Sequence, residues 1–298
     1  MDQPLFSIIV PTYNRAHLIS KTIESILNQT YTHFELIIVD DGSTDDTETV
    51  IRKFLSDKVS YYKKANEERA AARNYGARQA NGDYVNWFDS DDIMLPDNLS
   101  EAAKSIEKYG RVEVLVQGYT YKNESGKTIH QSHFSENPNA DMYISNQVAN
   151  SPVIVRRDIA LANPFNEDRE LSGSEDYELW LRLAAKYKFH TSEKRTVDYI
   201  CHDERSTILM HNADQLINRY TKLIFYISTN KEVAAFLGNN MAYFTMKTYL
   251  LLAVDLVISD HLRPGVKYLL KGFASSPMII FERGFYAFIK HFLRHTFS

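Results

Sequence analysis

The sequence predicts an α/β protein built on a doubly wound, mostly parallel sheet, with a helical extension at its C-terminal end. Short apolar runs of strand length recur along the first part of the chain, and the segments between them have apolar residues at helical spacing. Beyond Ser206 the spacing is helical throughout. We therefore expect two regions: residues 1–205, which contain the sheet, and residues 206–298, which contain only helices.

The first strands are expected over residues 6–10, ending at Pro11, and 34–39, ending at Asp40. The segment between them is amphipathic, and the whole has the length of a strand–helix–strand crossover. The next expected elements are, in order, a helix over 45–55, a strand over 59–62, an Ala-rich helix over 67–80 that ends at Asn81-Gly82, and a strand over 84–88. Parallel sheets of this kind hold ligands beyond the carboxyl ends of their strands.

The later part of the sheet region is less regular. We expect, in order, a helix over 99–109, strands over 112–116 and 153–155, and a helix over 175–189. Residues 121–139 show no periodicity and are interpreted as a loop or a short antiparallel excursion.

Composition and charge exclude several classes of protein. The 298 residues are 44% hydrophobic and 24% charged, with a mean hydropathy of −0.36, as in a soluble globular protein. The single cysteine, Cys201, can form neither an internal disulfide nor a zinc cluster, which indicates a reducing compartment. The apolar stretch over 249–258 contains Asp255 and is shorter than the ~20 residues of a spanning helix. No basic and apolar signal segment precedes the first expected strand, so we expect a cytoplasmic protein.

The charge is distributed unevenly along the chain. Residues 205–298 hold 11 basic and 5 acidic residues, a net +6, while residues 1–204 hold 23 and 33, a net −10. Nucleic-acid binding needs clustered Lys and Arg, so we expect no nucleic-acid partner, and a nuclease or polymerase is disfavoured.

The turn after the first strand contains Pro11, Thr12 and Tyr13. No glycine precedes Gly42, so a glycine-rich dinucleotide turn and a P-loop are both excluded there. A proline-locked turn of this kind can present a flat ring for stacking on a base, or it can simply end the strand.

Two clusters of carboxylates follow expected strands. Asp40 and Asp41 end the second one, where a carboxylate can accept the imide N–H of a pyrimidine. Asp89, Asp91 and Asp92 follow the strand over 84–88, and three carboxylates within four residues suit Mg²⁺ or Mn²⁺ bound together with a diphosphate. The alternative for this second cluster is a solvated acidic loop that caps the next helix.

Three further positions carry titratable groups of interest. Glu175 and Asp176 begin a helix, where one carboxylate is explained by capping, and Asp176 shares a helical face with Trp180, an arrangement suited to a general base. Arg73 on the Ala-rich helix can bind phosphate. His202 is a lone histidine that is either a partly buried polar residue or a ligand.

The combination of these motifs resembles family 2 inverting glycosyltransferases of the GT-A fold over residues 5–205. The matching segments are Ser7-Ile8-Ile9-Val10-Pro11-Thr12-Tyr13-Asn14, Val39-Asp40-Asp41-Gly42-Ser43-Thr44-Asp45, Ala72-Arg73-Asn74, Asp89-Ser90-Asp91-Asp92 and Glu175-Asp176-Tyr177-Glu178-Leu179-Trp180-Leu181-Arg182. The resemblance implies a nucleotide-sugar donor, commonly a UDP-sugar, and a divalent metal that bridges its diphosphate to the acidic DXD cluster.

The resemblance also implies a role for each matching residue. It assigns Asp176 as the catalytic base with Glu175 as its neighbour. The residues implied to bind the nucleotide are Pro11, Thr12, Tyr13, Asp40, Asp41, Arg73 and Asp89, and those implied at the metal are Asp91, Asp92 and, less directly, His202. The implied reaction is a single displacement at the anomeric carbon by a hydroxyl of a glycan or lipid-linked acceptor, with inversion. This is the chemistry of a hexosyltransferase in polysaccharide biosynthesis.

Two other functions share part of this pattern. A sugar-nucleotide pyrophosphorylase would need a glycine-rich basic loop after its first strand, and none is present. A non-catalytic nucleotide-sugar or carbohydrate-binding module would lose the base, whereas Glu175 and Asp176 are both present.

The C-terminal region mixes aromatic and basic residues. Its aromatic residues Phe281, Phe285, Phe288 and Phe292 recur at helical spacing, which is typical of an interfacial helix and also of a packed core or an oligomer interface. We expect either peripheral contact with the inner face of the membrane, or packing on the sheet region or in a homo-oligomer.

Overall fold

The computed structural model describes residues 3–146, 148–201 and 212–297. Contacts between residues divide the chain into two compact units. Unit 1 is Met1–Asn139, Gln147–Arg169 and Tyr187–His202, and unit 2 is Ala140–Asn146, Glu170–Lys186 and Asp203–Ser298. The sequence predicts a single boundary near residue 205, and this stays a prediction. In the division by contacts, two segments before that residue, Ala140–Asn146 and Glu170–Lys186, group with the C-terminal helices.

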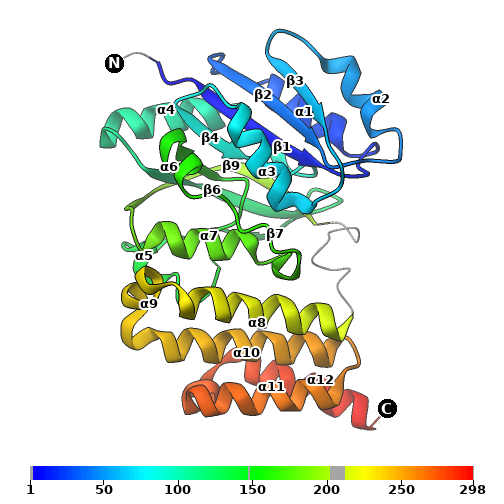
Figure 1. The fold of residues 1–298 in the computed structure, drawn as a ribbon, viewed down its shortest axis with the longest axis vertical. Helices are drawn as coiled ribbons and strands as arrows, with labels where there is room; N and C mark the ends of the chain where they lie inside the picture. Colours follow the sequence, from blue (N-terminus) through cyan, green and yellow to red (C-terminus); the bar gives the residue numbers. More distant parts are fainter. Residues whose placement is uncertain (1–2, 147, 202–211, 298) are drawn as a thin grey trace. The chain divides into compact units, whose positions relative to one another are not determined.

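Unit 1 contains a mixed sheet whose nine described strands have the order β3-β2-β1-β4-β8-β6-β9-β5, with β7 paired to β6 (Figure 1). The strands are β1 (Phe6–Thr12), β2 (Phe34–Asp40), β3 (Val59–Lys63), β4 (Tyr84–Trp87), β5 (Ile93–Met94), β6 (Val114–Asn123), β7 (Thr128–Gln131), β8 (Val153–Arg156) and β9 (Phe189–Cys201). The first four in the order are parallel neighbours, as the crossover pattern predicts. Beyond β4 the pairing turns antiparallel, except between β6 and β9.

The expected loop over 121–139 holds the end of β6 and the strand β7, which form an antiparallel pair. The expected helix over 175–189 ends earlier, because α7 stops at Ala184 and residue 189 begins β9. The sequence of β9 has many polar and charged residues, so its strand character is not visible as an apolar run.

Helices cover both faces of the sheet in unit 1. They are α1 (Ile19–Leu27), α2 (Thr47–Ile51), α3 (Glu68–Gln79), α4 (Asn98–Tyr109) and α6 (Arg157–Ala162), with the 3-10 turn η1 (Arg52–Phe54). The helix α5 (Pro138–Asp141) and the 3-10 turn η2 (Arg169–Leu171) each have residues in both units. Apolar residues of α1, α2 and α4 form one core with alternate residues of the strands, including Ile8. Since successive strand residues point to opposite faces, Ile9 faces the other side, where α3 lies.

Gly76 allows α3 to lie close to the sheet. A Cβ at this position would come within 2.4 Å of Ile9 Cγ2 and 3.2 Å of Val39 Cγ2. Any larger residue would therefore push the helix away from β1 and β2.

Unit 2 is helical. Its helices are α7 (Glu175–Ala184), α8 (Ala213–Thr229), α9 (Lys231–Leu237), α10 (Met241–Ile258), α11 (Leu262–Ser275) and α12 (Arg283–Phe297), with the 3-10 turns η3 (Gly238–Asn240) and η4 (Pro277–Phe281). The central helix α10 contacts α8, α11 and α12, and its apolar residues form a core with residues of those helices, among them Leu216, Tyr268 and Phe288.

Two observations bear on the expectations for this region. The segment Lys231–Ile258 is long and apolar enough to cross a membrane by length and composition, with 44% of its most apolar window buried, although the apolar run over 249–258 alone is too short. Of the four aromatic residues at helical spacing, for which the sequence leaves both interfacial contact and packing open, Phe285, Phe288 and Phe292 pack inside unit 2, and Phe281 is 70% exposed. Aromatic residues at helical spacing commonly form the packed face of a helix, which accounts for Phe285, Phe288 and Phe292.

Candidate functional site

The turns after β1 and β2 are joined by hydrogen bonds at the carboxyl edge of the parallel strands. The Asn14 backbone N–H donates to Ser43 Oγ at 2.9 Å, and the Thr44 N–H donates to Asn14 Oδ1 at 2.9 Å. Asn14 has a φ of +50°, a left-handed conformation that asparagine tolerates. The two sequence motifs therefore form one surface.

Tyr13 is the most accessible of the three residues expected against a base. Its side chain is 46% exposed, whereas Pro11 and Thr12 are buried. The buried Thr12 Oγ1 has no hydrogen-bond partner among the described residues. The turn thus offers a flat ring to solvent on a fixed backbone.

The two carboxylates that end β2 differ in their partners. Asp40 is fully buried, with Oδ1 accepting from the Ser43 N–H and Oδ2 from the Tyr61 hydroxyl, each at 2.7 Å. Asp41 Oδ1 accepts from Lys64 Nζ at 2.9 Å and from the Glu67 N–H at 3.0 Å. Both oxygens of Asp40 thus stabilise the turn and the neighbouring strand β3.

Asp89 is held by residues from two other parts of unit 1. Its Oδ1 accepts from the Arg73 guanidinium at 2.7 Å and from Asn150 Nδ2 at 3.2 Å. The Arg73 side chain is 3% exposed and stacks over the Phe165 ring, with 5.1 Å between the guanidinium carbon and the ring centroid, while the Asp89 side chain is 31% exposed. Arg73 therefore contacts the carboxylate cluster from α3.

Ser151 connects the two ends of the acidic cluster. Its Oγ donates to Asp92 Oδ2 at 2.6 Å and accepts from the Asp89 N–H at 3.0 Å. The Ser151 N–H donates to the Tyr199 hydroxyl oxygen at 2.9 Å, and burial, followed by the charges of Asp92 and Asp89, raises the Tyr199 pKa. Asp92 is fully buried, whereas Asp89 and Asp91 remain partly exposed.

The expected metal site involves Asp91, Asp92 and His202. Among the described residues, no group of three or more His, Cys, Asp or Glu side chains is placed to hold an ion, and His202 lies outside the described residues. Mg²⁺ and Mn²⁺ at diphosphate sites commonly take only one or two carboxylates, with substrate oxygens and water completing the shell. Asp91 is partly exposed, whereas Asp92 is buried and its Oδ2 accepts from Ser151 Oγ; the assignment of Asp91 and Asp92 to the metal stays a prediction.

The expected base belongs to unit 2, at the start of α7. Glu175 is buried, and its Oε2 accepts from the Gly173 N–H at 2.6 Å, so it closes the turn before the helix. Asp176 is partly exposed, with Oδ1 accepting from the Tyr177 N–H at 2.7 Å and Oδ2 from Asn146 Nδ2 at 3.3 Å. Of the two carboxylates, Asp176 is the one that reaches solvent.

Asn150, Ser151 and Tyr199 were not identified from the sequence as site residues. Their partners are about 50 to 60 positions away along the chain, and the pairing of β8 with β4 and, through β6, with β9 brings them together. No motif in the sequence signals this arrangement.

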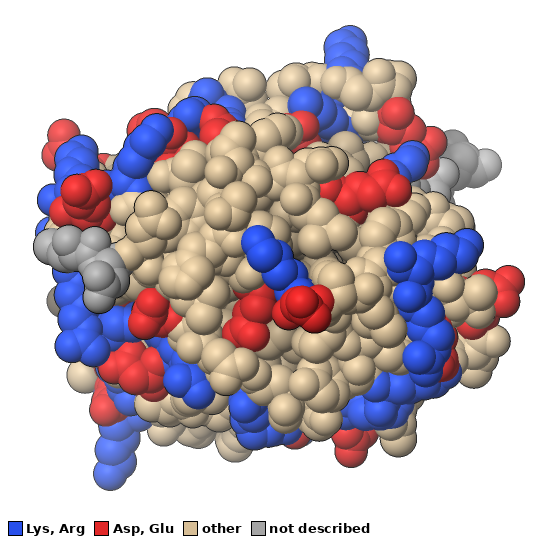
Figure 2. Space-filling model, turned by 90° about the horizontal axis from the view of Figure 1, so that it is seen from above, with Lys and Arg blue, Asp and Glu red and all other residues tan. Residues whose placement is uncertain are grey.

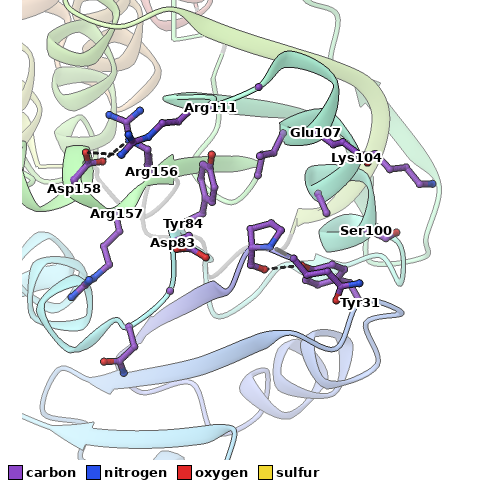
Figure 3. Close-up of a pocket in the computed structure, with 17 residues that line it drawn as sticks. Tyr31, Asp83, Tyr84, Ser100, Lys104, Glu107, Arg111, Arg156, Arg157 and Asp158 are labelled. Carbon is purple, nitrogen blue, oxygen red and sulfur yellow. Dashed lines mark hydrogen bonds and ion pairs between the residues drawn. The ribbon is translucent and has the colours of Figure 1, made fainter. Parts of the chain in front are cut away.

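A separate cavity lies at the amino ends of β1 and β4 (Figure 3). Its volume is about 1000 Å³, and its lining includes Tyr31, Tyr84, Arg111, Arg156 and Asp158. The Arg156 guanidinium already pairs with Asp158 at 2.6 Å. The residues expected to bind the donor follow β1 and β4 at the opposite ends of these strands and are not part of its lining.

Charged residues are distributed over the face of the molecule seen in Figure 2. Uncharged residues cover much of this face, Lys, Arg, Asp and Glu lie around its edge, and a small group of both signs lies near its centre.

Comparisons with known proteins place these features in context. Residues 7–161 match the model of the family described as glycosyl transferase family 2. The chain is 35% identical over 184 residues to an uncharacterized glycosyltransferase of Rickettsia felis, covering 60% of this chain and 30% of that protein. It is 30% identical over 196 residues to the GalNAc(5)-diNAcBac-PP-undecaprenol beta-1,3-glucosyltransferase of Campylobacter jejuni, covering 63% and 62%. The matches span between about a third and two thirds of these relatives.

Solved structures show the same fold. Staphylococcus aureus TarS in complex with UDP-GlcNAc superimposes with a TM-score of 0.64 at 19% identity, over 90% of this chain and 89% of that one. The mannosyltransferase PcManGT of Pyrobaculum calidifontis, in complex with GDP-Man and Mn²⁺, superimposes with a TM-score of 0.61 at 17% identity, over 99% and 88%. The fold is thus of the GT-A type.

Proposed function

The chain belongs to glycosyltransferase family 2, and from this premise we propose that it moves a sugar, with inversion, from a UDP-sugar to a hydroxyl of a glycan or lipid-linked acceptor. The observation that carries the proposal is the surface at the carboxyl edge of the parallel strands. Joined turns present Tyr13 there at the ends of β1 and β2, and Asp89 and Asp91 follow β4, the other neighbour of β1.

The nucleotide is proposed to lie on the joined turns. The exposed Tyr13 ring supplies a stacking face, and Asp41, fixed by Lys64 and the Glu67 N–H, supplies an acceptor for an imide N–H. Asp40 acts as a positioning residue, because its oxygens hold the turn and the Tyr61 hydroxyl.

The diphosphate is proposed to face the acidic cluster. Asp91, with Asp89 beside it, would hold a divalent metal, which when bound neutralises charge on the departing diphosphate. Arg73 and Asn150 fix the rotamer of Asp89, and Ser151 fixes the backbone at Asp89 and the side chain of Asp92. These contacts preorganise the carboxylates before the donor arrives.

The base is proposed to be Asp176. It takes the proton of the acceptor hydroxyl as the oxygen attacks the anomeric carbon, while the bond from that carbon to the nucleotide diphosphate breaks. Hydrogen bonds from the Tyr177 N–H and Asn146 Nδ2 orient the carboxylate. Glu175 supports this position through the turn at Gly173.

The acceptor is proposed to be a glycan or lipid-linked saccharide, supported by the polyprenol-linked saccharide in the name of the Campylobacter jejuni relative. Because the match covers only part of that relative, the linkage made by this chain is not carried over.

A calorimetric screen of nucleotide diphosphates and their sugars, with Mn²⁺ and with chelator, tests the donor assignment. We expect UDP and a UDP-sugar to bind in the presence of Mn²⁺, and binding stabilises the folded state in proportion to the logarithm of ligand concentration over Kd. If the nucleotide binds with equal affinity in Mn²⁺ and in chelator, the proposed metal dependence is contradicted. Binding of the nucleotide sugar without transfer of the sugar to any acceptor would favour a non-catalytic module. Formation of a nucleotide sugar from a sugar phosphate would favour a pyrophosphorylase.

A further inference from the structure

Exposed apolar side chains gather at the end of unit 2. Among the described residues, eight large apolar side chains between 262 and 297 are exposed: Leu270, Phe273, Met278, Ile280, Phe281, Tyr286, Ile289 and Leu293. The same stretch holds six Lys and Arg residues and one acidic residue, Glu282. Glu282 accepts from Lys247 Nζ at 2.7 Å and from the Tyr243 hydroxyl, so its charge is paired within unit 2.

Successive residues of α12 are 100° apart around its axis, and on this basis its side chains sort into three faces. Phe285, Phe288 and Phe292 form the buried face, where the Phe288 and Phe292 rings stack with centroids 5.8 Å apart. Next to it lies an exposed apolar face of Tyr286, Ile289 and Leu293, of which Tyr286 is 64% exposed.

A basic face lies on the far side of the apolar one. Arg283, Lys290 and Arg294 are exposed and fall within about 40° of one another on a helix of 3.6 residues per turn. The exposed part of α12 therefore consists of an apolar strip with a row of cations along one edge.

We propose that this face of α12, together with the exposed apolar residues of η4 just before it, binds the surface of an anionic lipid membrane. The apolar strip enters the boundary between headgroups and acyl chains, and the row of cations contacts lipid phosphates, which is how amphipathic helices lie in an interface. The bulky residues that enter are Met278, Ile280, Phe281, Tyr286, Ile289 and Leu293.

Charge favours a membrane over a second copy of this chain as the occupant. In a two-fold symmetric contact the same patch faces itself, so Arg283, Lys290 and Arg294 would meet their own copies. Like charges facing each other oppose association, and the stretch offers no unpaired carboxylate among its described residues to offset them. An anionic lipid surface supplies the opposite charge.

Co-sedimentation of the full chain with vesicles tests the proposal. Vesicles of phosphatidylcholine alone are compared with vesicles that contain 40% phosphatidylglycerol, at low and high salt. We expect binding to the anionic vesicles that weakens as salt rises. The variant R283E/K290E/R294E should bind at least about a hundredfold more weakly, since each basic residue near an anionic surface contributes about fivefold. The variant Y286S/I289S/L293S should also lose binding.

Matched controls separate the surface from general changes of charge and hydropathy. The variant K53E/K104E/K108E makes the same change of charge on exposed residues of unit 1, and L55S/I129S/L161S removes exposed apolar residues there. Both should bind as the unchanged chain does, and all four variants should keep its thermal unfolding midpoint. The proposal is overturned if the unchanged chain stays in the supernatant, if controls and test variants lose binding alike, or if light scattering shows a dimer that Y286S/I289S/L293S dissociates.

Discussion

The Arg73 guanidinium lies 2.7 Å from Asp89 Oδ1, which joins the middle of α3 to the residue that follows β4. Arg73 is almost fully buried, so the pair links a packed helix directly to the carboxylate cluster of the proposed donor site. Helix position and site geometry are therefore coupled.

Replacing Arg73 by alanine should lower the free energy of unfolding by about 2 kcal/mol, because it breaks an ion pair between buried Arg73 and partly exposed Asp89. Urea denaturation measures the change. The exposed Arg52, paired with Glu48 at 2.7 Å, is the control, and R52A should change stability by less than about 1 kcal/mol. Equal effects of the two substitutions would contradict the structural role of Arg73.

Replacing Asp91 by alanine should weaken Mn²⁺-dependent binding of UDP by about tenfold or more, since even outer-sphere partners of metals contribute that much. Calorimetry with Mn²⁺ and with chelator measures the effect. D57A, at an exposed acidic residue before β3, should leave the affinity unchanged. An unaltered affinity in D91A would remove Asp91 from the proposed metal site.

Replacing Asp176 by asparagine should reduce sugar transfer by ~10²-fold or more and leave donor affinity unchanged, because the base acts only in the chemical step. Transfer is measured as release of nucleotide diphosphate in the presence of acceptor. In contrast, E175Q should mainly lower stability, since Glu175 accepts from the Gly173 N–H. Undiminished transfer in D176N would show that another group takes the proton.

Replacing Ser151 by alanine should lower the free energy of unfolding by about 1–3 kcal/mol, because buried Asp92 loses the hydroxyl that donates to it. The same change should weaken nucleotide binding if Ser151 positions the cluster. S105A in α4 is the control for loss of a hydroxyl. A drop in stability with unchanged affinity would limit Ser151 to a structural role.

Asp255 makes unit 2 sensitive to pH. Burial is the main cause that raises its pKa above the usual 3.8, while the Tyr220 hydroxyl, 2.6 Å from Oδ2, acts in the opposite direction. A raised pKa means that the folded state holds the proton more tightly than the unfolded state. The resulting stabilisation is complete below about pH 3.8 and is lost as the pH rises through the folded-state pKa.

Asn at position 255 carries no such charge. We therefore expect the difference in free energy of unfolding between D255N and the unchanged chain to shift in favour of D255N when the pH is raised from about 3.5 to about 7. Urea denaturation at the two pH values measures this shift. D57N, at an exposed carboxylate, should show a smaller change. A difference between D255N and the unchanged chain that is the same at both pH values would contradict this account.

The sequence by itself determined the fold class, the first four parallel strands with their helices, and the motifs at the strand ends. These follow from local patterns, because apolar runs, helical spacing and turns such as that at Pro11 are set by neighbouring residues. The family resemblance rested on the same segments, and it is confirmed by the match over residues 7–161.

Only the tertiary structure decided which carboxylates are accessible. In sequence Asp89, Asp91 and Asp92 look alike, yet pairing of β4 with β8 brings Ser151 against Asp92, and packing of α3 on β1 and β2 brings Arg73 against Asp89. The same holds for α12, where Phe285, Phe288 and Phe292 face the core and Tyr286, Ile289 and Leu293 face solvent. Burial depends on partners that are distant along the chain, and periodicity alone cannot say which of two apolar faces a helix turns inward.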